Sequence, residues 1–229
     1  MVNVIVEICK KELKTRFGSK RVILPMVPSI GIPILAFVPQ LLVYISQEEP
    51  ESIYLTFLIF LVIPVMITTL VGINTFINEI RWKTIKSLLV APVSEEEIFI
   101  GKSLACIITG LLAEALLSGI ILIYLQNIDI SLIMLFIGVG PLSVIFTTFI
   151  IIIGTSRFPN IADGGGVVFI PMSGLVIIFM IFFLLREFLK INLALVYVIL
   201  ALIIAILTCG AYFIAKQWFN RENLVLGIV

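Results

Sequence analysis

The sequence predicts an all-α membrane protein with six transmembrane helices, an N-terminal interfacial helix and a helical cytoplasmic segment between the second and third spans. Of the 229 residues, 61% are apolar, and the mean hydropathy of +1.26 exceeds what a soluble domain of this length can bury. Six apolar runs also approach the roughly twenty residues that cross a bilayer. The runs cover residues 22–45, 53–77, 99–125, 131–153, 167–185 and 193–215.

The N-terminal segment, residues 1–21, is predicted to be an amphipathic helix at the membrane surface. Apolar residues recur at near-helical spacing from Val2 to Phe17, and lysines and arginines occupy the other faces. Thirteen of the fifteen basic residues fall on one side of the six-span topology, and only Arg186 and Lys190 fall on the other. The positive-inside rule therefore predicts a multi-pass protein of the cytoplasmic membrane with both termini in the cytoplasm. We expect residues 1–229 to form one domain.

The polar segment from Glu79 to Lys102 separates two apolar runs. Pro92 is expected to end a first amphipathic helix, because proline lacks an N–H and disfavours helical geometry in the residue before it. Ser94 and Glu97 have the spacing of a capping box, which predicts a new helix directly after them. That helix is expected to run from Glu95 to Leu125 without a break.

Composition argues against chemistry in this chain. It contains no histidine, and Cys9, Cys106 and Cys209 are isolated and expected to be free thiols. We therefore expect no catalytic, cofactor-binding or metal-binding residues, no cofactor, and no nucleic acid as partner. Gly101-Lys102-Ser103 lacks the preceding glycine and strand of a phosphate-binding loop, so Lys102 is expected to extend to the cytoplasmic interface and Gly101 to allow close helix packing.

Two features interrupt the spans. Gly138 to Pro141 in the fourth run is expected to kink its helix. Glu114 lies about twelve residues beyond Lys102, roughly 18 Å further along the helix and near the middle of the membrane. Its carboxyl is expected either to be protonated and hydrogen-bonded to a hydroxyl in the neighbourhood of Thr109 or Ser118 on an adjacent helix, or to lie on a transport path or at a subunit contact.

The central segment resembles the signature loop of ABC-2 type permeases, the membrane subunits of ATP-binding cassette transporters. The residues that carry the resemblance are Glu79, Thr84, Leu88, Leu89, Ala91-Pro92-Val93-Ser94, Glu97-Ile98 and Gly101-Lys102. The six spans, cytoplasmic termini and N-terminal interfacial helix extend it across the chain.

The resemblance implies a permease subunit that pairs with a second permease subunit, as a homodimer or heterodimer, and with two copies of a cytoplasmic ABC ATPase. The chain would then hydrolyse no ATP itself, and would export a small molecule or lipid-like substrate. Residues 79–94 would be the coupling helix region and residues 1–21 the connecting helix. The implied ATPase-coupling residues are Glu79, Arg81, Lys83, Thr84, Lys86, Leu88, Leu89 and Pro92.

A self-sufficient ion- or proton-coupled secondary transporter is the alternative function. Such proteins usually carry several ionisable groups within the membrane and paired repeats. This sequence has one such glutamate, Glu114, and no convincing repeat. The permease interpretation is therefore favoured.

Overall fold

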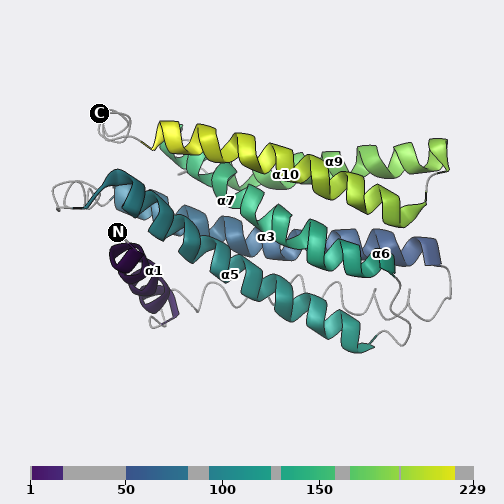
Figure 1. Cartoon of the computed structure of the whole chain (residues 1–229), viewed down its shortest axis with the longest axis horizontal. Coiled ribbons are helices and arrows are strands. Elements are labelled where there is room, and N and C mark those ends of the chain that lie inside the picture. The colour runs from purple at the N-terminus through teal and green to yellow at the C-terminus, as the bar shows by residue number, and fades with distance from the viewer. Residues whose placement is uncertain are drawn as a thin grey trace.

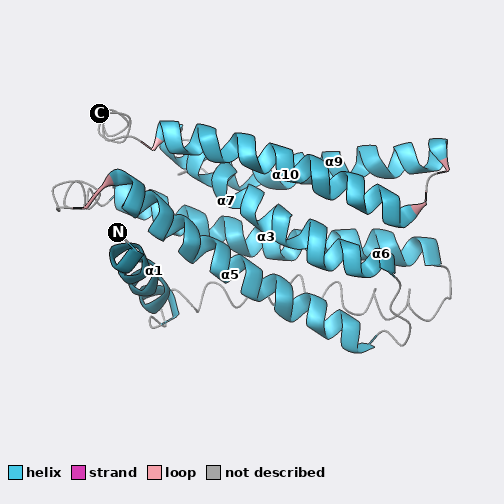
Figure 2. Cartoon of the chain, viewed as in Figure 1, coloured by secondary structure: helices cyan, strands magenta, loops and turns pink. Residues whose placement is uncertain are grey.

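The computed structural model describes residues 2–17, 50–81, 93–124, 130–157, 166–190 and 192–219. Within these residues the regular structure is helical throughout (Figures 1 and 2), as the apolar composition predicts. The helices are α1 (Val2–Phe17), α3 (Pro50–Arg81), α5 (Glu95–Tyr124), α6 (Ile130–Ile133), the π-helix η1 (Met134–Val139), α7 (Gly140–Arg157), α9 (Gly166–Leu189) and α10 (Leu193–Trp218).

Three of the helical stretches in the described part of the chain are long and apolar enough to cross a membrane: Glu95–Ile120, Ile130–Ser156 and Ala194–Trp218. They coincide with the third, fourth and sixth apolar runs. The second and fifth runs form α3 and α9, whose described apolar stretches, Leu61–Phe76 and Ser173–Phe182, are shorter. The first predicted span, residues 22–45, lies outside the described residues.

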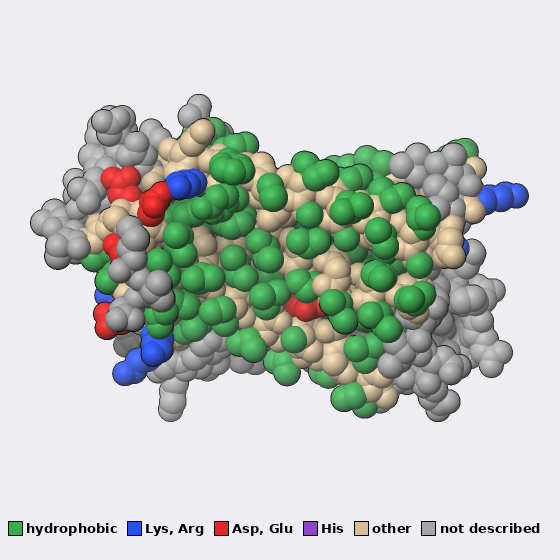
Figure 3. Space-filling view, in the orientation of Figure 1, with side chains coloured by type: hydrophobic (Ala, Val, Ile, Leu, Met, Phe, Trp, Pro, Cys, Tyr) green, Lys and Arg blue, Asp and Glu red, His purple; other side chains and the backbone are tan. Residues whose placement is uncertain are grey.

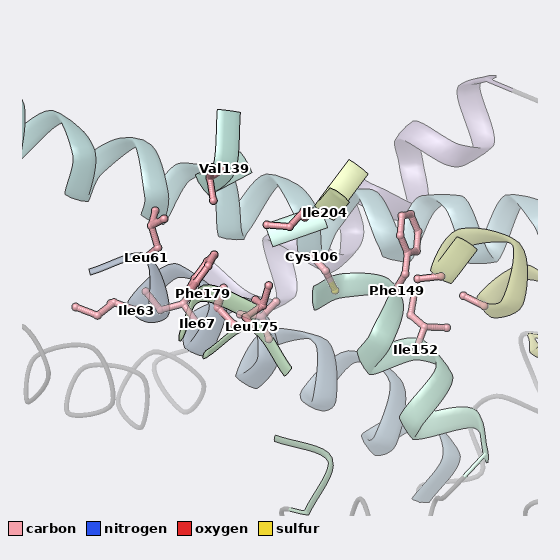
Figure 4. Packing of buried hydrophobic residues seen from close by; sticks show 14 of the residues in the cluster. Leu61, Ile63, Ile67, Cys106, Val139, Phe149, Ile152, Leu175, Phe179 and Ile204 are labelled. Carbon is pink, nitrogen blue, oxygen red and sulfur yellow. The ribbon is translucent and has the colours of Figure 1, made fainter. Parts of the chain in front are cut away.

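The long helices run side by side, whereas α1 lies at one end of the bundle beside the first turns of α5 (Figure 1). Helix α7 is central, because it packs against α3, α5, α9 and α10. One apolar cluster joins these elements. It includes Ile67 of α3, Cys106 of α5, Ile152 of α7 and Ile204 of α10 (Figure 4).

Small and hydroxyl residues allow the central helices to approach closely. A methyl group at Gly72 of α3 would lie 3.0 Å from Cγ2 of Ile151 on α7. The buried hydroxyls of Thr68, Thr69 and Thr75 donate to carbonyls four residues earlier in α3, so they are satisfied within their own helix. This is the packing expected where lipid supplies no hydrophobic driving force between helices.

The helix of the fourth apolar run departs from α-helical geometry near Gly138 to Pro141, where the sequence predicts a kink. The irregularity is a π-helical segment, η1, after which the Gly140 N–H donates to the Leu135 carbonyl five residues earlier. π-Helical turns inside α-helices are rare and occur frequently at functional sites. The face shown in Figure 3 is largely apolar along its length, with charged side chains gathered at the two ends and one acidic spot midway.

Candidate functional site

Helix α5 begins with the capping box that the sequence predicts. The Ser94 N–H donates to the Glu97 carboxylate at 3.0 Å, and the Glu97 N–H donates to the Ser94 Oγ at 3.3 Å. The Ser94 hydroxyl also donates to the same carboxylate at 2.9 Å. From this cap the helix continues unbroken for 30 residues to Tyr124, which confirms the predicted continuous helix as far as the described residues reach.

Helix α1 is fixed to α5 about two turns after Ser94. A methyl group at Gly101 would lie 2.8 Å from Cγ2 of Ile8 and 3.2 Å from the carbonyl oxygen of Ile5, so the two backbones approach as closely as a glycine permits. The predicted close packing at Gly101 is thus confirmed.

The prediction for Lys102 is wrong. Its side chain does not extend to water at the interface: the residue is 1% exposed, and its Nζ donates to Oε1 of Glu12 on α1 at 2.9 Å. The Nζ also lies 6.0 Å from the centroid of the Phe76 ring on α3. The reason is that α1 covers this end of α5, and a buried ammonium needs a charged partner. Lys102 therefore joins three helices.

The start of α5 and the end of α10 line an open pocket of about 720 Å³ that is rich in aromatic side chains. The Phe99 ring centroid lies 6.0 Å from that of Tyr212 and 5.5 Å from that of Phe219. On the rim, Glu96 of α5 forms an ion pair with Lys216 of α10. These contacts join the capped end of α5 to the last turns of α10.

In the middle of the bundle α5 packs against α3 and α7 through Gly110. A methyl group at Gly110 would overlap Thr68 Oγ1 of α3 and lie 2.6 Å from Cγ1 of Val144 on α7. This is a second position at which α5 approaches its neighbours too closely for a side chain.

Glu114 follows one turn later and is 5% exposed. Its Oε1 is buried and has no hydrogen-bond partner among the described residues. The carboxyl lies against Gly140 of α7, where a methyl group would be 2.5 Å from Oε1 and 3.0 Å from Cδ. Glu114 is therefore buried where α5 meets α7.

The predicted hydroxyl partners of Glu114 are wrong. The Ser118 hydroxyl donates to the backbone carbonyl of Glu114 at 2.7 Å, and the Thr109 hydroxyl donates to that of Ala105 at 2.7 Å. Both residues lie on α5 itself, and a hydroxyl in a helix readily bonds the carbonyl four residues earlier. Neither hydroxyl is thus the partner of the carboxyl.

The predicted ATPase-coupling residues fall largely outside the described residues. Glu79 and Arg81 lie in the last turn of α3, which continues from the second apolar run without a helix break; their side chains are not among those described. The remaining predicted coupling residues, Lys83, Thr84, Lys86, Leu88, Leu89 and Pro92, precede the described segment that begins at Val93.

Sequence reasoning missed three contacts: Lys102 with Glu12, Glu114 with Gly140, and Glu96 with Lys216. Glu12 is one of several charged residues on an amphipathic helix, and nothing in the sequence indicates which of them meets Lys102. The one available signal was Gly138 to Pro141, which marks the turn where the Glu114 carboxyl lies against Gly140. The three cysteines all lie among the described residues and form no disulfide, as predicted.

Comparison of the chain with protein-family models, with curated proteins and with solved structures finds no match in any of the three.

Proposed function

We propose that the chain is the transmembrane permease subunit of an ATP-driven ABC transporter that exports a small molecule or lipid-like substrate across the cytoplasmic membrane. The observation that supports this most is the form of α5. It is one helix of 30 residues that begins at a capped, charged end and reaches the buried Glu114. Glu114 lies nineteen residues after Glu95, about 28 Å further along the helix.

A continuous helix of this kind transmits force from a cytoplasmic partner to the middle of the membrane. The junction with α1 stiffens it, because the Lys102–Glu12 ion pair and the close contact at Gly101 hold the two helices together. A displacement of the capped end would therefore move α1 and α5 as one body. Packed elements of this type convert small shifts at one site into rigid-body motion elsewhere.

The partner would be a soluble ABC ATPase in two copies, seated on the coupling segment that leads into α5. We place Leu88, Leu89 and Pro92 in the seat. The basic residues Arg81, Lys83 and Lys86 would face an acidic rim on the ATPase. A second permease subunit, identical or related, would complete a transporter with six spans and cytoplasmic termini in each subunit.

Affinity purification from native membranes tests the proposal. The tagged chain should retain a soluble P-loop ATPase in stoichiometric amount, identified by mass spectrometry. Leu89→Glu should abolish this recovery, because a carboxylate would be buried in the seat without a partner. Lys190→Glu is the matched control, because it lies in the connection between the fifth and sixth predicted spans, on the other side of the membrane from the coupling segment. It should leave recovery of the ATPase unchanged. Equal recovery with both variants, or no ATPase with the unaltered chain, would refute the proposal.

A secondary transporter is the second candidate, and Glu114 favours it. A buried carboxyl with no described hydrogen-bond partner for Oε1 is the kind of group that proton-coupled carriers use. Solute movement in liposomes that contain this chain alone, driven by a proton gradient and without ATP, would establish that candidate. Dependence on ATP and a second protein would exclude it.

A further inference from the structure

The pocket between the start of α5 and the end of α10 combines aromatic side chains with charged ones. Its volume of about 720 Å³ lies in the range of about 300–1,000 Å³ that is typical of sites for drug-sized ligands. Its described lining does not include Glu114. The pocket is therefore a candidate binding site separate from the buried carboxyl in the middle of the bundle.

The pocket exists because side chains, rather than close backbone packing, join α5 to α10 at this end of the bundle. Helix α10 packs mainly against α7, whereas α5 packs mainly against α1 and α3. The start of α5 and the end of α10 nevertheless lie at the same end of the molecule (Figure 1). The Phe99 ring fills part of the space between them, where it contacts Tyr212 and Phe219, and the remaining space is open.

Aromatic rings form the apolar part of the lining. Phe99 and Phe219 are buried, so their rings are fixed by the surrounding helices. Phe213 is 63% exposed, and its ring centroid lies 5.6 Å from that of Tyr212. Its ring surface is thus accessible to a ligand in the pocket. The faces of such rings attract organic cations, and groups of them bind quaternary ammonium ligands in other proteins.

The charges of the lining also favour a cation. Two carboxylates, Glu95 and Glu96, and one ammonium, Lys216, contribute to it, which gives a net charge of −1. Glu96 and Lys216 form an ion pair in which both side chains are about half exposed, and exposed pairs of this kind are weak. A cationic ligand could therefore replace the Lys216 ammonium beside Glu96 at little cost, whereas an anion would meet an excess of negative charge.

We propose that this pocket binds a soluble organic cation that carries one positive charge on an aromatic or branched apolar body. The charge lies beside Glu95 and Glu96, in the place of the Lys216 ammonium, and the apolar body contacts the rings of Tyr212 and Phe213. Together with the proposed export function, on which this assignment rests, the pocket makes amphipathic organic cations the substrate class and is their point of entry from the cytoplasm.

Equilibrium dialysis of the purified full chain in an uncharged maltoside detergent tests the site. The probe is tetraphenylphosphonium, and protein-free micelles are the blank. The unaltered chain should bind this cation saturably, and tetraphenylborate, which has the same shape and the opposite charge, should not compete. Absence of saturable binding, or equal competition by tetraphenylborate, would overturn the proposal.

Two variants that both break the Glu96–Lys216 pair should change the affinity in opposite directions. Glu96→Gln should weaken binding about fivefold, whereas Lys216→Met, which removes the competing ammonium, should strengthen it by about the same factor. Glu7→Gln, which alters an exposed carboxylate on α1, is the matched control and should leave the affinity unchanged. Equal weakening by the first two variants would mean that the pair only holds α5 to α10, and would overturn the proposal.

The aromatic contribution is tested at Phe213. Phe213→Leu keeps an apolar side chain but removes the ring, and should weaken binding about threefold. Phe188→Leu, at an exposed position near the end of α9, is its control and should have no effect. If the two variants had the same affinity for tetraphenylphosphonium, the ring of Phe213 would not contact the cation as proposed.

Binding of the probe requires no ATPase, so failure of the pocket and failure of the permease assignment can be told apart. If an ATPase co-purifies with the chain but the cation does not bind saturably, the pocket is refuted and the permease assignment stands. If the cation binds as predicted but no ATPase co-purifies, the binding site stands and its role in ATP-driven export is refuted.

Discussion

The Nζ of Lys102 on α5 lies 2.9 Å from Oε1 of Glu12 on α1, and the lysine side chain is almost fully buried. This pair connects the N-terminal helix to the long helix that continues to Glu114. It is the only ion pair between α1 and α5 that the described residues show. The integrity of the α1–α5 unit should therefore depend on it.

Breaking this pair should destabilise the protein. Glu12→Gln removes the carboxylate charge beside the buried ammonium of Lys102, which we expect to cost about 3 kcal/mol and to lower the Tm in detergent. Lys11→Met, an exposed position on the same helix, is the control and should have little effect. The double variant with Glu12→Lys and Lys102→Glu should recover part of the lost stability. If the Tm of this double variant were as low as that of Glu12→Gln, a direct ion pair between the two positions would be contradicted.

Glycines of α5 should differ in their tolerance of alanine. Gly110→Ala would overlap Thr68 and Val144, and such overpacking typically costs about 1–3 kcal/mol. Gly119→Ala meets nothing within 4 Å, so its higher helix propensity should make it neutral or stabilising by up to about 1 kcal/mol. Thermal unfolding of the two variants side by side measures the difference. Equal Tm values would mean that α3, α5 and α7 do not meet closely at Gly110.

The capping box should control the order of the first turn of α5. Ser94→Ala removes the acceptor for the Glu97 N–H and should cost about 1 kcal/mol. Faster amide hydrogen exchange at residues 95–98 is the expected signature. Ser94→Thr retains the hydroxyl oxygen and should preserve protection, so equally fast exchange in both variants would contradict the role of the cap.

Sequence reasoning predicted the features that depend on residues close together in the chain and missed those that depend on residues far apart. The Ser94–Glu97 cap and the continuous helix after it were predictable because local spacing determines them. The irregularity near Pro141 was predictable in place, but its π-helical form was not, because glycine and proline indicate a break without specifying its hydrogen-bond register. The partner of Lys102 was not predictable, because it lies 90 residues away on another helix. The helical class follows from composition alone.

The most direct test of the central claim, that the segment leading into α5 seats an ATPase, is site-specific photocrosslinking in native membranes. A photoreactive phenylalanine analogue placed at Leu88 should crosslink to a soluble P-loop ATPase, and nucleotide should change the yield. The same analogue at Leu112, an exposed position in the middle of α5, should give no such product. An ATPase adduct from Leu88 alone is the predicted result; no adduct at Leu88, or equal adducts at both positions, would contradict the account.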